Sequence, residues 1–383
     1  MEQTYDFDEI RCYNDSEIPE KLWTLVDRPE IEAFVKGAFP DIDMAQLRAQ
    51  IKQITTIDGF QSAVVGQFVF GMIKKTSSSF EVYGAEKVDK EKASLFITNH
   101  RDIVFDPSIV CAALTQNNLK TAEVAIGDNL FAYDWIEELV RLNKCFVVKR
   151  NVPVRQMLDI SKRLSAYIHY TINEKKTPVW IAQREGRSKD SKDDTQPSVI
   201  KMLALGGGTR DIIQNIRQLN VQPTTLIYEY DPCDFLKAAE FQLKRDNPEW
   251  KKSKQDDVIS MKTGLVGFKG RVAVSFGDQL NPIFDTYPWI DDRNAQVNCV
   301  CKLVDKIIHS SYVLYPINYV AYDLKYECEK YASEYTAEEK AKVMEYLNGQ
   351  LAKIDIPNKD ENFLWDKLIT MYSNPVVNKE NVQ

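Results

Sequence analysis

Short apolar runs recur along the middle of the chain, separated by longer stretches in which apolar residues return every three or four positions. The runs predict buried strands at 93–98, 121–126, 145–149, 178–183, 224–230 and 271–276. The stretches 107–116, 130–142, 154–173 and 197–219 have helical spacing. Strands that alternate with helices predict an α/β fold with a mostly parallel sheet flanked by helices, over residues 80–290.

Helical additions are expected on both sides of this domain. Residues 1–79 read as an N-terminal helical region, and residues 291–383 read as a C-terminal helical extension with helices at 291–310, 317–331 and 336–354. Apolar residues between Ile51 and Met72 form a stripe at helical spacing, directly before Lys74 and Lys75. Such a stripe is typical of a helix packed on the core or of one lying in a membrane interface.

The composition narrows the class of protein. Among 383 residues, 49 Lys and Arg face 56 Asp and Glu, and this net charge of −7 argues against nucleic acid as a partner. Seven scattered cysteines indicate no disulfide framework and a reducing, cytoplasmic setting, and the isolated Cys299 and Cys301 do not predict a metal site. The acidic segment 1–15 does not resemble a signal peptide. The longest uncharged run, 59–73, is too short to span a bilayer, so we expect no integral span.

One of the three histidines has a context that suits catalysis. His100 follows the predicted strand 93–98, at the carboxyl end where α/β proteins form their sites. Asp106 and Pro107 then predict the start of a helix, with Asp106 as its N-cap. A carboxylate beside one imidazole nitrogen would fix the tautomer and leave the other nitrogen as a base. Asp106 is the favoured partner of His100, and Asp102 is its rival.

Basic residues follow two further strands. Lys149 and Arg150 end one of them, and the segment Arg184-Glu185-Gly186-Arg187-Ser188 ends the other. Three strand ends of a parallel sheet should converge on one edge, which would bring guanidinium groups close to His100. Because arginine binds phosphate with paired donors, this edge suits a phosphorylated substrate.

Taken in order, these segments resemble the glycerolipid acyltransferase family, which includes lysophosphatidic acid and glycerol-3-phosphate acyltransferases. The first family block, Asn-His, four residues and Asp, is similar to Asn99-His100 and Asp106, which have five residues between them. The second, third and fourth blocks are similar to 146–150, 181–188 and 221–227. The third block keeps Glu-Gly and Arg-Ser but lacks the usual Pro and Thr, which bears on substrate specificity.

The resemblance implies transfer of a fatty acyl group from acyl-CoA or acyl-carrier protein to a hydroxyl of a lysophosphatidic acid or glycerol-3-phosphate type acceptor, without a cofactor or metal. His100 would be the base, oriented by Asp106 or Asp102. The residues expected to bind the acceptor are Lys149, Arg150, Arg184, Glu185, Gly186, Arg187 and Ser188. We also expect a peripheral protein on the cytoplasmic face of a membrane, with the membrane surface as a partner. An amino-acid lipid as acceptor, and a non-catalytic lipid- or acyl-carrier-binding protein, remain alternatives.

Overall fold

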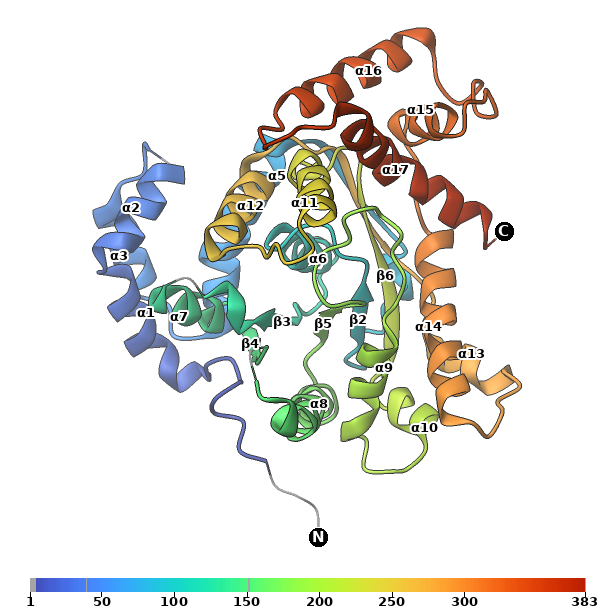
Figure 1. Cartoon of the computed structure of the whole chain (residues 1–383). Helices are drawn as coiled ribbons and strands as arrows, with labels where there is room; N and C mark the ends of the chain where they lie inside the picture. The colour runs from blue at the N-terminus through green and yellow to red at the C-terminus, as the bar shows by residue number, and fades with distance from the viewer. Residues whose placement is uncertain (1–4, 39, 132, 151, 383) are drawn as a thin grey trace.

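The computed structural model describes residues 5–38, 40–131, 133–150 and 152–382 (Figure 1). Residues 1–4 of the acidic N-terminal segment lie outside the described residues. The centre of the molecule is a seven-stranded sheet in the order β1-β7-β6-β2-β5-β3-β4. Its strands are β1 (Ser77–Tyr83), β2 (Leu95–Thr98), β3 (Glu123–Gly127), β4 (Cys145–Val148), β5 (Val179–Ala182), β6 (Val221–Tyr228) and β7 (Gly270–Phe276).

Five neighbouring strands of the sheet run in the same direction. β6, β2, β5, β3 and β4 pair in parallel, whereas β7 is antiparallel to β6 and β1 is parallel to β7. The predicted α/β class with a mostly parallel sheet is therefore confirmed. Because the five strands share a direction, the segments after β2, β4 and β5 leave the sheet at one edge.

Alternate side chains of the strands bury on opposite faces of the sheet. Leu95 and Ile97 belong to one core cluster, together with residues of α8 (Met157–Asn173) and α14 (Arg293–Ser310). Phe96 belongs to the other cluster, together with residues of α5 (Gly66–Thr76) and α6 (Phe105–Gln116). This alternation is the period-two pattern expected of strands covered on both faces.

Seventeen α-helices surround the sheet in the described part of the chain. Besides α8 and α14 they are α1 (Ile18–Val26), α2 (Pro29–Ala38), α3 (Met44–Ile51), α4 (Ile57–Phe60), α5 (Gly66–Thr76), α6 (Phe105–Gln116), α7 (Asp134–Leu142), α9 (Pro197–Leu203), α10 (Ile212–Arg217), α11 (Asp234–Asp246), α12 (Lys254–Val266), α13 (Leu280–Thr286), α15 (Pro316–Lys325), α16 (Ala337–Ala352) and α17 (Glu361–Glu380). Short 3-10 turns lie at Asp15–Glu17, Ala85–Lys87, Asp128–Leu130, Val154–Gln156 and Ala204–Gly206, and Gln61–Val65 is π-helical. No helix among the described residues combines the length and hydropathy that crossing a bilayer requires.

The apolar stripe between Ile51 and Met72 faces the protein. It is divided by a turn after α3, and its second part runs through α4, the π-helical segment and α5. Ile51 and Phe60 are buried in a core formed by the N-terminal helices and α7, and Met72 is buried against α6 and the sheet. This cluster of N-terminal helices lies beside α7 at the left of Figure 1.

Several elements differ from the predicted ones. β1 was not predicted, and it straddles the boundary that we placed between residues 79 and 80. Within the stretch 197–219, which has helical spacing, the chain forms two helices, α9 and α10, and Gly208 between them has a φ of +77°, the left-handed conformation that commonly follows a helix end.

The C-terminal extension contains one helix more than predicted. α14, α15 and α16 occupy the predicted segments, and α17 follows them. α17 packs with α15, α16 and α11, and its residues join the main core. Pro375 lies inside α17, and a proline argues against a helix when only the sequence is read.

Candidate active site

His100 lies between β2 and α6, at the edge where the parallel strands end. Its Nδ1 is 2.7 Å from Oδ2 of Asp106, whose carboxyl group is fully buried in the first turn of α6. The His100 side chain is 14% exposed and lines a large cleft. Since Nδ1 is bound to the carboxylate, Nε2 is the nitrogen left to accept a proton.

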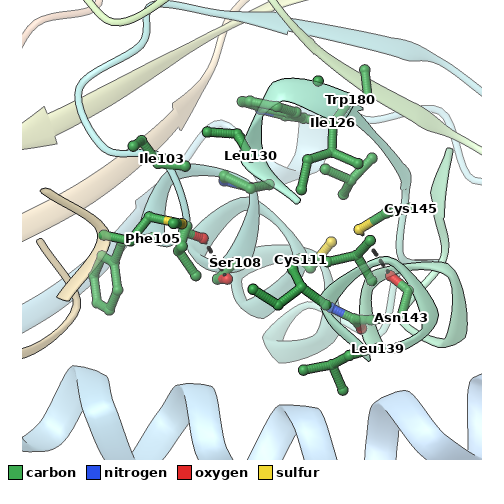
Figure 2. A pocket seen from close by; sticks show the side chains of 18 of the residues that line it. Ile103, Phe105, Ser108, Cys111, Ile126, Leu130, Leu139, Asn143, Cys145 and Trp180 are labelled. Carbon is green, nitrogen blue, oxygen red and sulfur yellow. Dashed lines mark hydrogen bonds between the residues drawn. The ribbon is translucent and has the colours of Figure 1, made fainter. Parts of the chain in front are cut away.

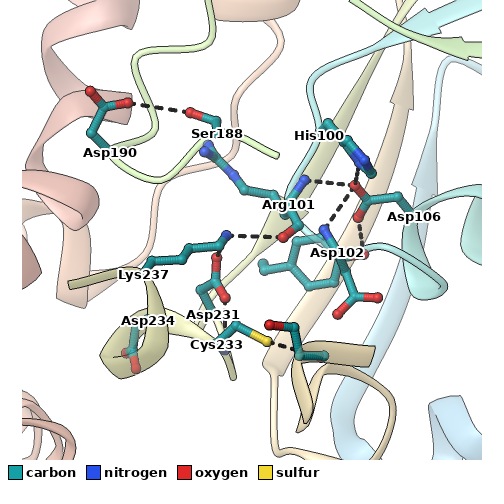
Figure 3. A network of polar contacts seen from close by, with 12 residues as sticks. His100, Arg101, Asp102, Asp106, Ser188, Asp190, Asp231, Cys233, Asp234 and Lys237 are labelled. Atoms are coloured by element: carbon teal, nitrogen blue, oxygen red, sulfur yellow. Dashed lines mark hydrogen bonds and ion pairs between the residues drawn. The ribbon is translucent and has the colours of Figure 1, made fainter. Parts of the chain in front are cut away.

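The Asp106 carboxylate accepts three further hydrogen bonds (Figure 3). Oδ2 accepts the backbone N–H groups of Arg101 and Asp102 at 2.6 and 3.0 Å, and Oδ1 accepts the hydroxyl of Tyr228 at 2.7 Å. Burial and the charge of Asp106 hold the pKa of Tyr228 well above its usual value, so its phenol stays a donor. Sequence reasoning did not identify Tyr228, which is 122 residues away from Asp106.

Asp102 stabilises the start of α6. Its Oδ1 accepts the backbone N–H groups of Val104 and Phe105 at 2.9 and 2.7 Å. α6 begins at Phe105, so the prediction that Asp106 is the N-cap was wrong, and the capping bonds come from Asp102 instead. Burial and the nearby charge of Asp106 raise the pKa of Asp102. The structure thus pairs His100 with Asp106 and uses Asp102 to shape the turn between them.

Cationic side chains from two strand ends line the same cleft as His100. Lys149 and Arg150 follow β4, and Arg184 and Arg187 follow β5. Arg150 Nη1 lies 2.9 Å from Oε1 of Glu185, a carboxylate that is 70% exposed. Such a surface pair contributes about 0–1 kcal/mol, so an anionic ligand can replace the carboxylate at little cost.

The Glu185-Gly186 turn also lines the cleft. Gly186 has a φ of +70°, a conformation that side-chain-bearing residues rarely adopt, and open space surrounds it. The backbone N–H of Glu185 donates to Oε1 of Gln196 at 2.8 Å. Ser188 is buried behind the turn, where its backbone N–H donates to the carbonyl of His100 at 2.8 Å. The structure therefore brings all the predicted site residues together, with Ser188 supporting the turn from behind.

A buried ion pair lies beside His100, and the sequence did not indicate it. The guanidinium of Arg101 contacts both carboxylate oxygens of Asp193, at 3.1 and 2.6 Å. The carbonyl of Arg101 accepts a hydrogen bond from Nζ of Lys237 at 2.9 Å, and Lys237 forms an ion pair with Asp231 (Figure 3). These partners come from distant parts of the chain, and only the fold reveals them.

The cleft extends from the polar edge into an apolar interior between the N-terminal helices, α6 and α7. Its volume is about 2250 Å³, roughly twice the ~1,000 Å³ of the largest ordinary small-molecule sites. Figure 2 shows side chains of α6, α7, β3 and β5 around this interior, among them Phe105, Cys111, Ile126, Leu139 and Trp180. Such a space can hold a long hydrocarbon chain. Each methylene group buried there stabilises the bound chain by about 0.8 kcal/mol.

The described residues contain no group of three or more His, Cys, Asp or Glu side chains arranged to hold a metal ion. The chemistry that this site offers comes from an imidazole–carboxylate pair, a cationic edge and an apolar cleft.

Part of the chain matches a known protein family. Residues 79–223 match the family model described as Acyltransferase, and this match confirms the family resemblance of the motifs between His100 and Ser188. The crystal structure of the 1-acyl-sn-glycerophosphate acyltransferase PlsC from Thermotoga maritima is similar with a TM-score of 0.38 and 12% identity, over 74% of this chain and 94% of that chain. A sequence comparison with curated proteins finds no match.

Proposed function

Because residues 79–223 match the acyltransferase family model, we propose that the protein transfers a fatty acyl group from a thioester to a hydroxyl of a phosphorylated glycerol or lysolipid. The observation that carries this proposal is the His100–Asp106 pair, which stands where a cationic edge meets an apolar cleft. A hydroxyl beside a phosphate and a thioester beside an acyl chain would meet at this imidazole.

In the reaction, Nε2 of His100 accepts the proton of the acceptor hydroxyl. The oxygen attacks the thioester carbonyl carbon, a C–O bond forms and the C–S bond breaks. The thiolate then takes the proton back from the imidazolium and leaves as a thiol. Asp106 stabilises the imidazolium and is itself held by four hydrogen bonds. General base catalysis of this kind contributes about 10²–10⁴ in rate.

The cationic edge is the proposed binding site for the acceptor phosphate. Arg184 and Arg187 line the cleft, and Nη1 of Arg187 is buried with no hydrogen-bond partner among the described residues. The guanidinium of Arg150 is paired with the exposed Glu185. Guanidinium groups bind phosphate with paired hydrogen bonds, and Lys149 adds charge. Arginine binds carboxylates in the same way, so an amino-acid lipid is the alternative acceptor.

The apolar cleft is the proposed binding site for the acyl chain, with acyl-CoA or acyl-carrier protein as the donor and no cofactor. Large apolar side chains at its rim are exposed, namely Phe34, Phe70, Tyr133 and Met157. A rim of this kind favours contact with a lipid surface, from which a lysolipid can enter. We therefore propose that the protein binds at the periphery of a membrane, on the cytoplasmic face that its free cysteines favour.

The proposal is tested by thiol release from a palmitoyl thioester in the presence of phospholipid vesicles. Lysophosphatidic acid, glycerol-3-phosphate and an acylated amino acid are offered separately, each with the CoA and the acyl-carrier protein donor. We expect turnover that depends on a phosphorylated acceptor. Turnover with the amino-acid lipid alone would show that the acceptor is this lipid and not a phosphorylated one. Saturable lipid binding without turnover under any condition would support a binding protein instead.

A further inference from the structure

Side chains from beyond residue 290 hold the loop that follows β5. This loop, residues 184–196, carries Arg184 and Arg187 at its start. The family match ends at residue 223, so the C-terminal extension lies outside the matched segment. Its contacts with the loop come from two places, α17 and the end of α14.

α17 contributes two amide side chains. Nδ2 of Asn374 donates to the carbonyl of Asp190 at 2.7 Å. Nδ2 of Asn378 donates to the carbonyls of Ser191 and Lys192 at 3.0 and 3.1 Å, and Asn378 is only 7% exposed. These bonds satisfy three consecutive loop carbonyls with donors from one helix.

The loop needs such support because part of its backbone is strained. Ser191 and Asp193 have φ values of +59° and +52°. A left-handed conformation costs an ordinary residue such as serine about 1–2 kcal/mol, whereas aspartate adopts it more readily. Ser191 keeps this conformation only where its surroundings impose it. The three bonds from α17 act directly at and beside Ser191.

The end of α14 and Tyr312, which follows it, hold Asp193 and Thr195 of the loop. Oδ1 of Asp305 accepts the backbone N–H and the hydroxyl of Thr195 at 2.8 and 2.5 Å. Nε2 of His309 lies 3.1 Å from the carbonyl of Asp193, and the hydroxyl of Tyr312 donates to the Asp193 carboxylate. That carboxylate also binds Arg101, the neighbour of His100.

From these contacts we propose that the C-terminal extension positions the acceptor-binding loop of the active site. Asn374 and Asn378 are positioning residues that act through residues 190–192 on Arg184 and Arg187. The loop reaches the catalytic turn as well, since Ser188 donates to the carbonyl of His100. The inference rests on the proposed function, because Arg184 and Arg187 are taken to bind the acceptor.

Packing of the extension on the core would also explain contacts of this kind, and the two roles differ in what they affect. A purely structural role would change global stability and leave the acceptor KM alone. A positioning role would loosen residues 186–195 and weaken acceptor binding, while binding of the acyl donor stays unchanged. Loop order and acceptor KM are therefore the two measurements that separate them.

The test compares Asn378→Ala and Asn374→Ala with Asn348→Ala. Asn348 is exposed on α16, and its Nδ2 donates to the carbonyl of Met344 within the same helix, so it is a matched control. Amide hydrogen exchange of the full chain is measured for the peptides that cover 184–196 and for those that cover β2 and β6. Steady-state KM values are measured for the donor and for the best acceptor.

For Asn378→Ala we expect faster exchange at 186–195 only and an acceptor KM raised roughly tenfold or more, because the carbonyls of Ser191 and Lys192 both lose their donor. The donor KM and the Asn348→Ala control should not change. Unchanged loop exchange, or faster exchange with an unchanged acceptor KM, would overturn the proposal. If Asn378→Ala loosens the whole chain, Asn374→Ala decides by the same criteria. If no acceptor supports turnover, the proposed function fails, and the exchange data alone decide whether the extension holds the loop.

Discussion

Gly264 lies directly against the carboxylate of Asp102. A Cβ at Gly264 would lie 1.7 Å from Oδ2 of Asp102. Gly264 is buried in α12, and Asp102 caps the helix that begins beside His100. The close approach of α12 to the catalytic turn therefore depends on the missing side chain.

We predict that Gly264→Ala destabilises the protein and reduces its activity. In an unhindered helix, alanine in place of glycine stabilises by about 0.5–1 kcal/mol. At Gly264 the methyl group must displace Asp102, and overpacking of this kind costs about 1–3 kcal/mol. Urea unfolding and the turnover number measure the two effects.

Gly71 in α5 provides the control, because the Cβ that Gly71→Ala would add meets no described atom within 4 Å apart from its chain neighbours and the backbone of its own helix. This variant should be as stable as the wild type or more stable, with its activity retained. If Gly264→Ala behaved in the same way, the close packing between α12 and the catalytic turn would not restrict the site.

Loss of the Tyr228 hydroxyl should lower kcat more than it lowers the stability of the fold. Tyr228→Phe removes the hydroxyl that donates to Oδ1 of Asp106, while Oδ2 keeps its three donors. We expect kcat to fall about tenfold, as for the loss of one hydrogen bond to a charged group. Tyr170→Phe, at an exposed position of α8, is the control and should leave kcat at the wild-type value. A Tyr228→Phe enzyme with full kcat would show that the orientation of Asp106 does not depend on the phenol.

The buried amine of Lys269 makes the stability depend on pH. Its Nζ donates to the carbonyl of Gly267 at 2.8 Å and lies 4.2 Å from the ring centre of Phe105. Burial lowers the pKa of Lys269 from 10.5 to about 8. Between these values the unfolded chain binds more protons than the folded protein, so this group makes the free energy of unfolding rise with pH, by at most about 1.4 kcal/mol per pH unit.

Urea unfolding at pH 8, 9 and 10 checks this prediction through the difference between wild type and Lys269→Met. Tyrosines also titrate near pH 10, and the difference removes their common contribution. The wild type should gain stability relative to Lys269→Met as the pH rises, whereas Lys254→Met, at an exposed position, should follow the wild type. If the difference in the free energy of unfolding between wild type and Lys269→Met stayed constant with pH, Lys269 would have the same pKa in the folded and the unfolded state.

The apolar cleft should determine which acyl chains are used. Cys111 is half-buried on α6 and lines the cleft (Figure 2). Cys111→Phe adds bulk there, and each methylene group that no longer fits loses about 0.8 kcal/mol, or roughly fourfold in kcat/KM. We therefore expect the preference for a sixteen-carbon over an eight-carbon donor to fall by about tenfold or more, while Cys111→Ala keeps it. Equal losses for both donors would place the acyl chain elsewhere.

Local patterns in the sequence predicted much of the fold and of the site. The alternating burial of Leu95, Phe96 and Ile97 comes from a short apolar run, and the parallel strands place the residues after each run at one edge. This reasoning located His100, Arg150 and Arg187 at one cleft. It did not find β1, an edge strand that begins with three serines and is buried only in part.

The remaining parts of the site depend on contacts between distant segments. Tyr228 reaches Asp106 across 122 residues, and Arg101 pairs with Asp193 across 92 residues. Neither contact has a local spacing that a single sequence could reveal. The helix start was placed at Asp106 because its carboxylate precedes a proline, but that carboxylate is occupied by His100 and Tyr228, and Asp102 takes the capping role.

The measurement that tests the central claim most directly is acceptor-dependent thiol release by wild type and by His100→Ala, at saturating donor and acceptor. If His100 is the base, kcat should fall by about 10²–10⁴, with acceptor binding retained and circular dichroism unchanged. A His100→Ala protein that turns over like the wild type would contradict the account, because another group would then remove the proton.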